Sequence, residues 1–313
     1  MKHNKKGVAI SVIVVILLLL LPLFIGTEHI LNLFVMLFIT FMLAQSWNVL
    51  GGYAGQISLG NAAFFGIGAL SFHFLAWRAG IPIYMALPAG GISAVILASI
   101  IGFPAFRLKG AFFAVGSLAL AEVLRITVGN IFPVAVYIPT EYITTYKLLS
   151  RYYVGLTAAV LTQGVAYYMI RSKTGLAMTA IRDDAEAANT SGINLFKYKF
   201  SALVFSSFFS GLAGGVFAYY QISIVPSSLF SPHWTFEPLV AASIGGGGTL
   251  SGAIIGSVFL IILQELFALT LGKGYLIIFG AMCIGVILFF PHGLVEVSRR
   301  IRKYFQVRGV SNK

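Results

Sequence analysis

Charge is scarce in this sequence. Only 10% of its 313 residues are charged, while 58% are hydrophobic, and soluble domains carry about 25% charged residues. The mean hydropathy is +0.93. These values exclude a water-soluble domain of this length and predict an all-α polytopic membrane protein.

Residues that usually carry catalysis or bind metals are also few. The single cysteine, Cys283, can form neither an intrachain disulfide nor a metal site on its own. The five histidines are scattered, and none has metal-ligand spacing. There is no Ser/His/Asp set, no Walker A motif and no dinucleotide fingerprint. The sequence therefore predicts no catalytic residue, no metal site and no cofactor bound by this chain.

The net charge of +12 reflects membrane topology rather than nucleic-acid binding. Lys and Arg collect on the cytoplasmic side of membrane proteins. Here they precede the first apolar segment at 8–25, follow the last one, and recur in an interior loop at 171–199. We therefore predict that both termini and this loop are cytoplasmic, which requires an even number of crossings. No nucleic-acid partner is expected.

The apolar pattern predicts a single transmembrane domain over 1–313 with about ten segments. Each needs about 20 residues to cross a bilayer as a helix. The segments are 8–25, 30–50, 58–77, 83–102, 111–132, 152–170, 200–220, 234–247, 249–270 and 275–291, followed by a basic tail at 292–313. The first is interpreted as a retained span because no cleavage site follows it. The eighth is short and broken by glycine; without it, the count is nine and the tail faces outward.

Two glycine-rich stretches, 51–70 and 242–258, differ from plain lipid-facing helix. Glycine lets a helix break where a bundle or cavity satisfies the freed backbone, and such breaks mark transport pathways. The alternative is that these glycines serve helix packing alone. The halves start in opposite orientations, which predicts an inverted repeat, although the breaks match only loosely. The candidate path residues here are Gly55, Gln56, Ser58, Asn61, Gly245, Gly246 and Thr249.

Glu122 and Arg125 are charged residues within an apolar segment. Ionisable residues at membrane depth are costly and usually face the protein interior. Their i, i+3 spacing places them on one helix face. Glu122 is a further candidate path residue, and a structural ion pair is the alternative.

The interior loop holds a concentrated group of acids, Asp183, Asp184 and Glu186. Acids favour the start of a helix, alanines propagate it, and Gly192 suits a left-handed C-terminal cap. We therefore predict a short cytoplasmic helix whose small-residue surface docks on another protein. A solvated helix without a partner is the alternative.

Several motifs resemble one known family. The Glu186-Ala187-Ala188 run followed by Gly192 resembles the coupling loop of ABC importer permeases. Its surroundings, "GLAMTAIRDDAEAANTSGINLFKYKF", and the stretch "SWNVLGGYAGQISLGNAAFFGIGAL" resemble the signatures of the branched-chain amino acid permease family. "FRLKGAFFAVGSLALAEVLR", "SIGGGGTLSGAIIGS" and "FFPHGLVE" resemble its LivM-type half.

This resemblance implies a permease subunit of an ATP-driven importer in a bacterial or archaeal cytoplasmic membrane. Its implied partners are a LivH-like second permease subunit, two cytosolic ATPase subunits that hold ATP and Mg, and an extracytoplasmic substrate-binding protein. The implied ATPase-coupling residues are Arg182, Asp183, Asp184, Glu186, Ala187, Ala188 and Gly192. The implied substrates are branched-chain or other small apolar amino acids.

One region departs from the family pattern. The segment "TVGNIFPVAVYIPTEYITTYKLLSRYY" lacks most of a Gly/Asn-rich piece found in LivM-type proteins. It lies on the expected outer side, so the departure bears on the substrate more than on the mechanism.

An ion-coupled secondary transporter of small neutral solutes is the alternative function. It would need no ATPase but would often carry a buried acid for ion coupling. Glu122, Glu237 and Glu265 are the candidates for that acid. Such a transporter has no use for a docking helix in the interior loop, which favours the importer.

Overall fold

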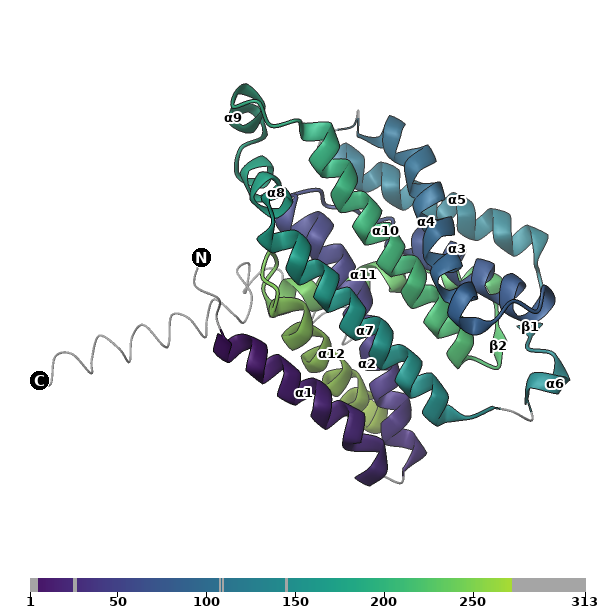
Figure 1. The fold of residues 1–313 in the computed structure, drawn as a ribbon. Coiled ribbons are helices and arrows are strands. Elements are labelled where there is room, and N and C mark those ends of the chain that lie inside the picture. Colours follow the sequence, from purple (N-terminus) through teal and green to yellow (C-terminus); the bar gives the residue numbers. More distant parts are fainter. Residues whose placement is uncertain (1–4, 25–26, 107, 109, 144–145, 272–313) are drawn as a thin grey trace, which may run out of the picture.

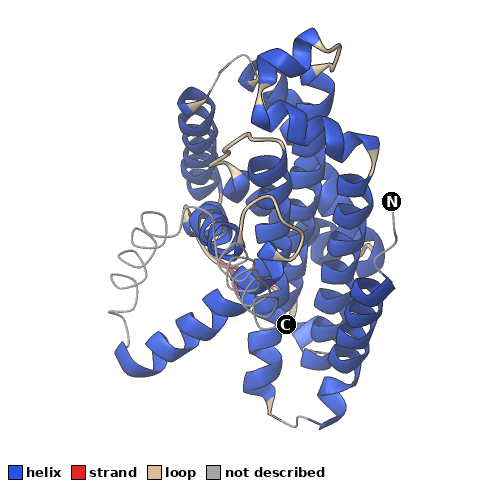
Figure 2. Cartoon of the chain, turned by 90° about the vertical axis from the view of Figure 1, so that its left-hand side faces the viewer, coloured by secondary structure: helices blue, strands red, loops and turns tan. Residues whose placement is uncertain are grey.

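The computed structural model describes residues 5–24, 27–106, 108, 110–143 and 146–271, with side chains from residue 12 to 267. The predicted segment at 275–291, the basic tail and Cys283 lie outside this part of the chain. The described chain is nearly all helix, with two short strands (Figure 2).

Twelve α-helices are described: α1 (Lys5–Phe24), α2 (Glu28–Trp47), α3 (Asn61–His73), α4 (Ile83–Ala105), α5 (Ala111–Ile131), α6 (Thr140–Ile143), α7 (Leu148–Arg171), α8 (Lys173–Asp183), α9 (Ala185–Thr190), α10 (Leu195–Tyr220), α11 (His233–Gly245) and α12 (Gly252–Leu271). Two π-helical turns, η1 (Asn48–Tyr53) and η2 (Phe74–Arg78), extend α2 and α3, and η3 (Pro226–Phe230) is a 3-10 turn. Strand β1 (Val136–Tyr137) pairs antiparallel with β2 (Ser223–Ile224).

Five of these helices are long and apolar enough to cross a membrane, namely Glu28–Tyr53, Ile83–Ala105, Ala111–Ile131, Leu148–Arg171 and Leu195–Tyr220. The chain is therefore an all-α, multi-pass membrane protein, as predicted. The predicted segment at 58–77 is helical only from Asn61, and the one at 234–247 is α11, which has 13 residues. Thirteen residues rise about 20 Å, less than the hydrocarbon core. The count of ten segments stays a prediction.

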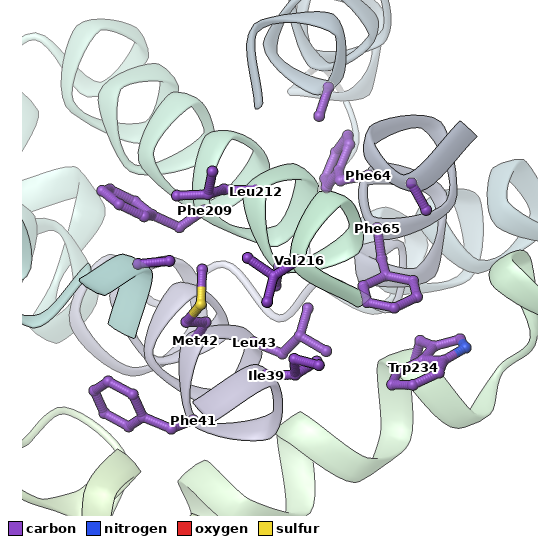
Figure 3. Packing of buried hydrophobic residues seen from close by; sticks show 14 of the residues in the cluster. Ile39, Phe41, Met42, Leu43, Phe64, Phe65, Phe209, Leu212, Val216 and Trp234 are labelled. Carbon is purple, nitrogen blue, oxygen red and sulfur yellow. The ribbon is translucent and has the colours of Figure 1, made fainter. Parts of the chain in front are cut away.

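Helices α2 and α10 form the centre of the bundle. The apolar stretch of α10 is 78% buried and that of α2 with η1 is 67% buried, against 17% for α5 at the edge. Side chains of α2, α3 and α10 meet between them (Figure 3). Within this core, Phe65 of α3 stacks on Trp234 of α11 with ring centroids 4.1 Å apart.

Glycines let three of the helices cross with their backbones in contact. A Cβ on Gly68 of α3 would lie 2.1 Å from the carbonyl oxygen of Gly211 in α10, and one on Gly90 of α4 would lie 2.8 Å from that of Gly68. Small residues permit such close approach between membrane helices. Packing is therefore one role of the chain's glycines, including Gly68 within the first predicted glycine-rich stretch.

Main-chain carbonyl groups of helix α1 accept hydrogen bonds from α7. Pro22 has no N–H, so the carbonyl of Leu18, four residues earlier, lacks its helical partner. The hydroxyl of the fully buried Tyr152 in α7 donates to that carbonyl at 2.7 Å. A carbonyl of α1 that lacks its helical partner is thus hydrogen-bonded by a side chain of α7.

The bundle has two distinct ends (Figure 1). One carries α8 and α9, and we call it the α8–α9 end. The other carries α6 and the β1–β2 pair, and we call it the β1–β2 end. The loops 48–55 and 246–251 both lie at the α8–α9 end, where Asn48 and Gly52 contact Gly248. An inverted repeat places equivalent breaks at opposite ends, so these two loops are not equivalent to each other.

Candidate functional site

The interior loop contains two short helices rather than one. Ser172 caps α8 by accepting a hydrogen bond from the Thr174 N–H at 3.1 Å. Asp183, predicted at the start of the coupling helix, is instead the last residue of α8. The break that follows puts Asp184 in extended geometry, and its Oδ1 accepts from the N–H groups of Glu186 at 2.9 Å and Ala187 at 3.0 Å. Asp184 is therefore the N-cap of α9.

Gly192 ends α9 as predicted. Its φ is +81°, its N–H donates to the Asn189 carbonyl at 3.0 Å, and the Ile193 N–H donates to the Ala188 carbonyl at 3.0 Å. These two bonds form a Schellman motif, which favours glycine at the left-handed position. The predicted short helix and its end at Gly192 are confirmed, whereas its start lies after Asp183.

The exposed surface of α9 is narrower than the sequence suggests. Glu186 and Ala187 are exposed, but Ala188 is only 5% exposed because α9 packs against α8 and α10. A helix presents each face every 3.6 residues, so neighbouring alanines cannot share one surface. Ala188 anchors α9, and Glu186 and Ala187 remain available to a partner.

Arg182 connects α8 to the loop after α2. Its Nη1 donates to the Gly52 carbonyl at 2.8 Å. Its Nε and Nη2 donate to Asp183 Oδ1 at 3.2 and 3.1 Å. Gly55 has a φ of +68°, and a Cβ there would lie 2.9 Å from Arg182 Cγ. Two predicted coupling residues and one predicted path residue thus meet at the α8–α9 end.

Asn48 joins the two glycine-rich loops, and the sequence reading did not assign it to the site. Its Oδ1 accepts from the Gly248 N–H at 2.7 Å and its Nδ2 donates to the Thr249 carbonyl at 2.9 Å. A Cβ on Gly52 would lie 2.4 Å from the nitrogen of Gly248. In the sequence, Asn48 is an isolated amide residue in an apolar segment, close to Gly51 and Gly52. Its hydrogen-bond partners lie 200 residues further along the chain, so the sequence did not reveal them.

The glycines after α11 have separate roles. Gly246 and Gly248 adopt φ values of +114° and +78°, which form the turn. Thr249 stabilises that turn, because its Oγ1 donates to the Gly246 carbonyl at 2.8 Å and accepts from the Gly252 N–H at 3.1 Å. Gly245 is buried instead, since a Cβ there would lie 1.8 Å from the Gly252 carbonyl oxygen in α12. Gly245 therefore lies at a helix crossing, and its role in the path stays a prediction.

The other predicted path residues after α2 are mostly buried. The Ser58 Oγ accepts from the Gly60 N–H at 3.2 Å, and the Ser58 carbonyl accepts from Trp47 Nε1 at 2.9 Å. The Gln56 N–H donates to the Leu50 carbonyl at 3.0 Å. Asn61 is fully buried at the start of α3, and both polar atoms of its amide lack a partner within the described chain. Buried amides of this kind usually meet water or a ligand.

Glu122 lies apart from this group, on α5. Arg125 Nε donates to Glu122 Oε2 at 2.9 Å, and Nη2 makes a second bond to Oε1. The predicted pair is confirmed. Both side chains are about two-fifths exposed, near the middle of the least buried of the five long helices.

Within the described ranges, no three His, Cys, Asp or Glu side chains lie close enough together to hold a metal ion. Around Arg182 and Asn48, the described contacts join main-chain groups, one amide, one guanidinium, the Asp183 carboxylate and the Thr249 hydroxyl. This arrangement can transmit or block movement.

Comparison with known proteins gives a consistent result. The family described as the permease component of the branched-chain amino acid transport system matches residues 29–289. The high-affinity branched-chain amino acid transport system permease protein LivM of Escherichia coli is 25% identical over 290 residues, covering 82% of this chain and 68% of its own. A LivM permease of Methanocaldococcus jannaschii is 23% identical over 233 residues, covering 65% of this chain and 68% of its own. A LivH permease of the same organism is 29% identical over 144 residues, covering 43% and 44% of the two chains. No solved structure matches.

Proposed function

Because the chain belongs to the family of branched-chain amino acid transport system permease components, we propose that it forms half of the translocation path of an ATP-driven importer. The substrate would be a branched-chain or another small apolar amino acid. The cytosolic ATPase subunits would hold ATP and Mg, and an extracytoplasmic binding protein would deliver the substrate. A LivH-like subunit would supply the other half.

The observation that carries this proposal is the short capped helix α9. It has defined bonds at both ends, a buried Ala188 that anchors it and an exposed Glu186–Ala187 surface. It leads within five residues into α10, the most buried long helix. A stiff element joined to the bundle centre transmits a rigid-body movement that a flexible loop would absorb. A motor acting from the cytoplasm needs such an element.

The Glu122–Arg125 pair on α5 supports a second permease subunit. Both charged groups are partly exposed on a helix that presents most of its surface outward. Hydrocarbon does not solvate charge, so ionisable groups at this depth face protein or an aqueous path. We infer that the partner subunit covers this face of α5 and that Glu122 lies beside the path between the subunits.

The contacts within the bundle also support the predicted inverted repeat. Helix α10 packs against α3 and α4, as α2 packs against α11 and α12. Under this pairing the break after α2 corresponds to residues 221–232 at the β1–β2 end, which include η3. Ten spans with both termini in the cytoplasm, and the α8–α9 end on the same side, fit this arrangement and the basic loop at 171–199.

The test is reconstitution. The chain should co-purify with ATPase subunits, and the purified complex in liposomes should take up labelled leucine only when ATP is present on the α8–α9 side. Transport by the chain alone along an ion gradient would instead support the secondary transporter. If neither ATP nor an ion gradient drives uptake, both functions are contradicted.

A variant of the coupling helix sharpens this test. Gly192→Val forces a β-branched side chain into a left-handed conformation, which costs about 1–2 kcal/mol, and it should reduce uptake per ATP hydrolysed while the protein stays inserted. Glu186→Trp should do the same by filling the docking surface. Lys173→Gln, in the same loop, is the matched control. Unchanged coupling in both variants would contradict the role of α9.

A further inference from the structure

Arg182 is the described side chain of the α8–α9 pair that reaches both glycine-rich loops. One of its nitrogens, Nη1, bonds the Gly52 carbonyl. The other two face Asp183, which holds the guanidinium plane in position. A guanidinium presents its donors in a rigid fork, so Asp183 directs Nη1 toward the loop.

The loops are shaped around this side chain. Gly55 and Gly248 both have positive φ, and a Cβ on either would meet Arg182, at 2.9 Å from Cγ and 2.5 Å from Nη1 respectively. Any other residue at these positions would collide with Arg182 and strain the backbone. Gly55 and Gly248 are far apart in the sequence, yet both lie close to Arg182. The packing of a single loop would not require both.

The side-chain amide of Asn48 links the two loops, so we expect them to move together. This amide bonds both the N–H of Gly248 and the carbonyl of Thr249. Gly52, four residues later, carries the carbonyl that Arg182 holds. A displacement of Arg182 therefore acts on the end of α2 and on the α11–α12 turn together.

We propose that Arg182 is a positioning residue that transmits movement of α8 and α9 to the paired loops 48–55 and 246–249. This rests on the proposed function, because it assigns the step between ATPase docking and opening of the path at its cytoplasmic end. The buried side of α8 is formed by Gly175, Ala177, Met178 and Ile181, which hold the helix on the bundle. Arg182 lies outside that packed face, and glutamine in its place keeps the Cβ and Cγ atoms that lie against Gly55, so the substitution leaves the packing of α8 in place.

The experiment compares Arg182→Gln with wild type in the full complex reconstituted in liposomes. Arg182→Gln should keep ATPase co-purification and hydrolysis but lower uptake per ATP by at least about fivefold, a usual size for coupling between sites. Arg182→Lys keeps the charge and one hydrogen bond, and should recover part of the loss. Lys173→Gln, a basic residue of the same helix with an exposed side chain, is the matched control.

A second pair of variants approaches the same contact from the loop. Gly248→Ala places a methyl group 2.5 Å from Nη1 and 2.9 Å from the Gly52 carbonyl oxygen, so it crowds the bond between these two groups and should also lower uptake per ATP. Gly80→Ala is its control, because Gly80 has a similar φ of +66° but no atom within 4 Å of an added Cβ. Gly80→Ala should therefore show backbone strain alone and leave coupling unchanged.

The outcomes separate the two proposals. If the wild-type complex shows no ATP-driven uptake, the proposed function fails. If it does, and Arg182→Gln and Gly248→Ala couple as wild type does, the role of Arg182 is overturned and the function stands. Loss of ATPase co-purification in Arg182→Gln would also overturn it, because Arg182 would then be a docking residue.

Discussion

In this protein, single side chains supply hydrogen bonds to main-chain groups that lack a partner within their own helix or turn. Pro22 frees the Leu18 carbonyl, and Tyr152 supplies the missing donor from another helix. Asn48 does the same for the turn after α11, where its amide bonds a donor and an acceptor of the main chain. Inside a membrane no water is present to bond such a group, so loss of the side-chain partner lowers the stability of the fold.

The Tyr152 repair predicts a measurable loss. Tyr152→Phe keeps the ring but leaves the Leu18 carbonyl unpaired, which should lower the free energy of unfolding by about 1–3 kcal/mol. The midpoint of thermal unfolding in detergent should fall by a few degrees. Tyr168→Phe on the same helix removes a hydroxyl from a side chain that is 79% exposed and should leave the midpoint unchanged. Equal midpoints for the two variants would contradict the assignment.

Among the elements, α3, α4 and α10 depend on a shared crossing at Gly68, Gly90 and Gly211. Backbone meets backbone there, so no side chain can move aside to make room. The contrast with α7 is direct, because a Cβ on Gly164 would have no neighbour within 4 Å. The same residue type is thus essential for packing in one helix and unconstrained in another.

This contrast predicts opposite effects of one substitution. Gly68→Ala should destabilise the protein by about 1–3 kcal/mol, the usual cost of overpacking. Gly164→Ala should keep or slightly raise stability, because alanine favours helix by about 1 kcal/mol. Thermal unfolding of the purified protein tests both. A stable Gly68→Ala variant would mean that the crossing is looser than these distances indicate.

Local signals were sufficient to predict the coupling helix but not its setting. An acid before alanines and a glycine after them are enough to place the ends of α9. The inward turn of Ala188 and the separate helix ending at Asp183 depend on packing against α10, which short-range patterns do not contain. Membrane segments were predictable from hydropathy, and α11 (His233–Gly245) is short as expected, whereas α3 starts at Asn61 rather than at residue 58.

The contacts that define the site could not be predicted for a simple physical reason. Asn48 lies 200 residues from Gly248 and 201 residues from Thr249 in the sequence. Sequence composition shows that glycine permits close approach but not what approaches. Arg182 was predicted to act toward the ATPase, and the structure adds a bond in the other direction, toward Gly52.

At the scale of the whole molecule, the two ends are chemically different. The α8–α9 end gathers the acidic and basic residues of the interior loop, and the β1–β2 end joins the chain after α5 to the chain after α10 through the β1–β2 pair. Only one orientation agrees with the excess of Lys and Arg in the loop at 171–199.

Cysteine labelling checks this orientation. In a Cys283→Ser background, Tyr137→Cys in β1 should react with an impermeant maleimide added outside intact cells. Asn189→Cys on α9, also exposed, should react only after the membrane is opened. The reverse pattern would invert the proposed topology.

The attachment of α1 has a consequence for how this helix can diverge. The hydrogen bonds described between α7 and α1 end on main-chain carbonyls, those of Leu18 and Leu19. Any apolar helix with a proline at the right turn offers the same carbonyl. We therefore expect α1 to tolerate exchange of its apolar side chains, and a Val12–Leu17 segment with shuffled order should retain the wild-type unfolding midpoint. The order of the apolar residues at 12–17 can therefore change, whereas Pro22 and Tyr152 are expected to change only together.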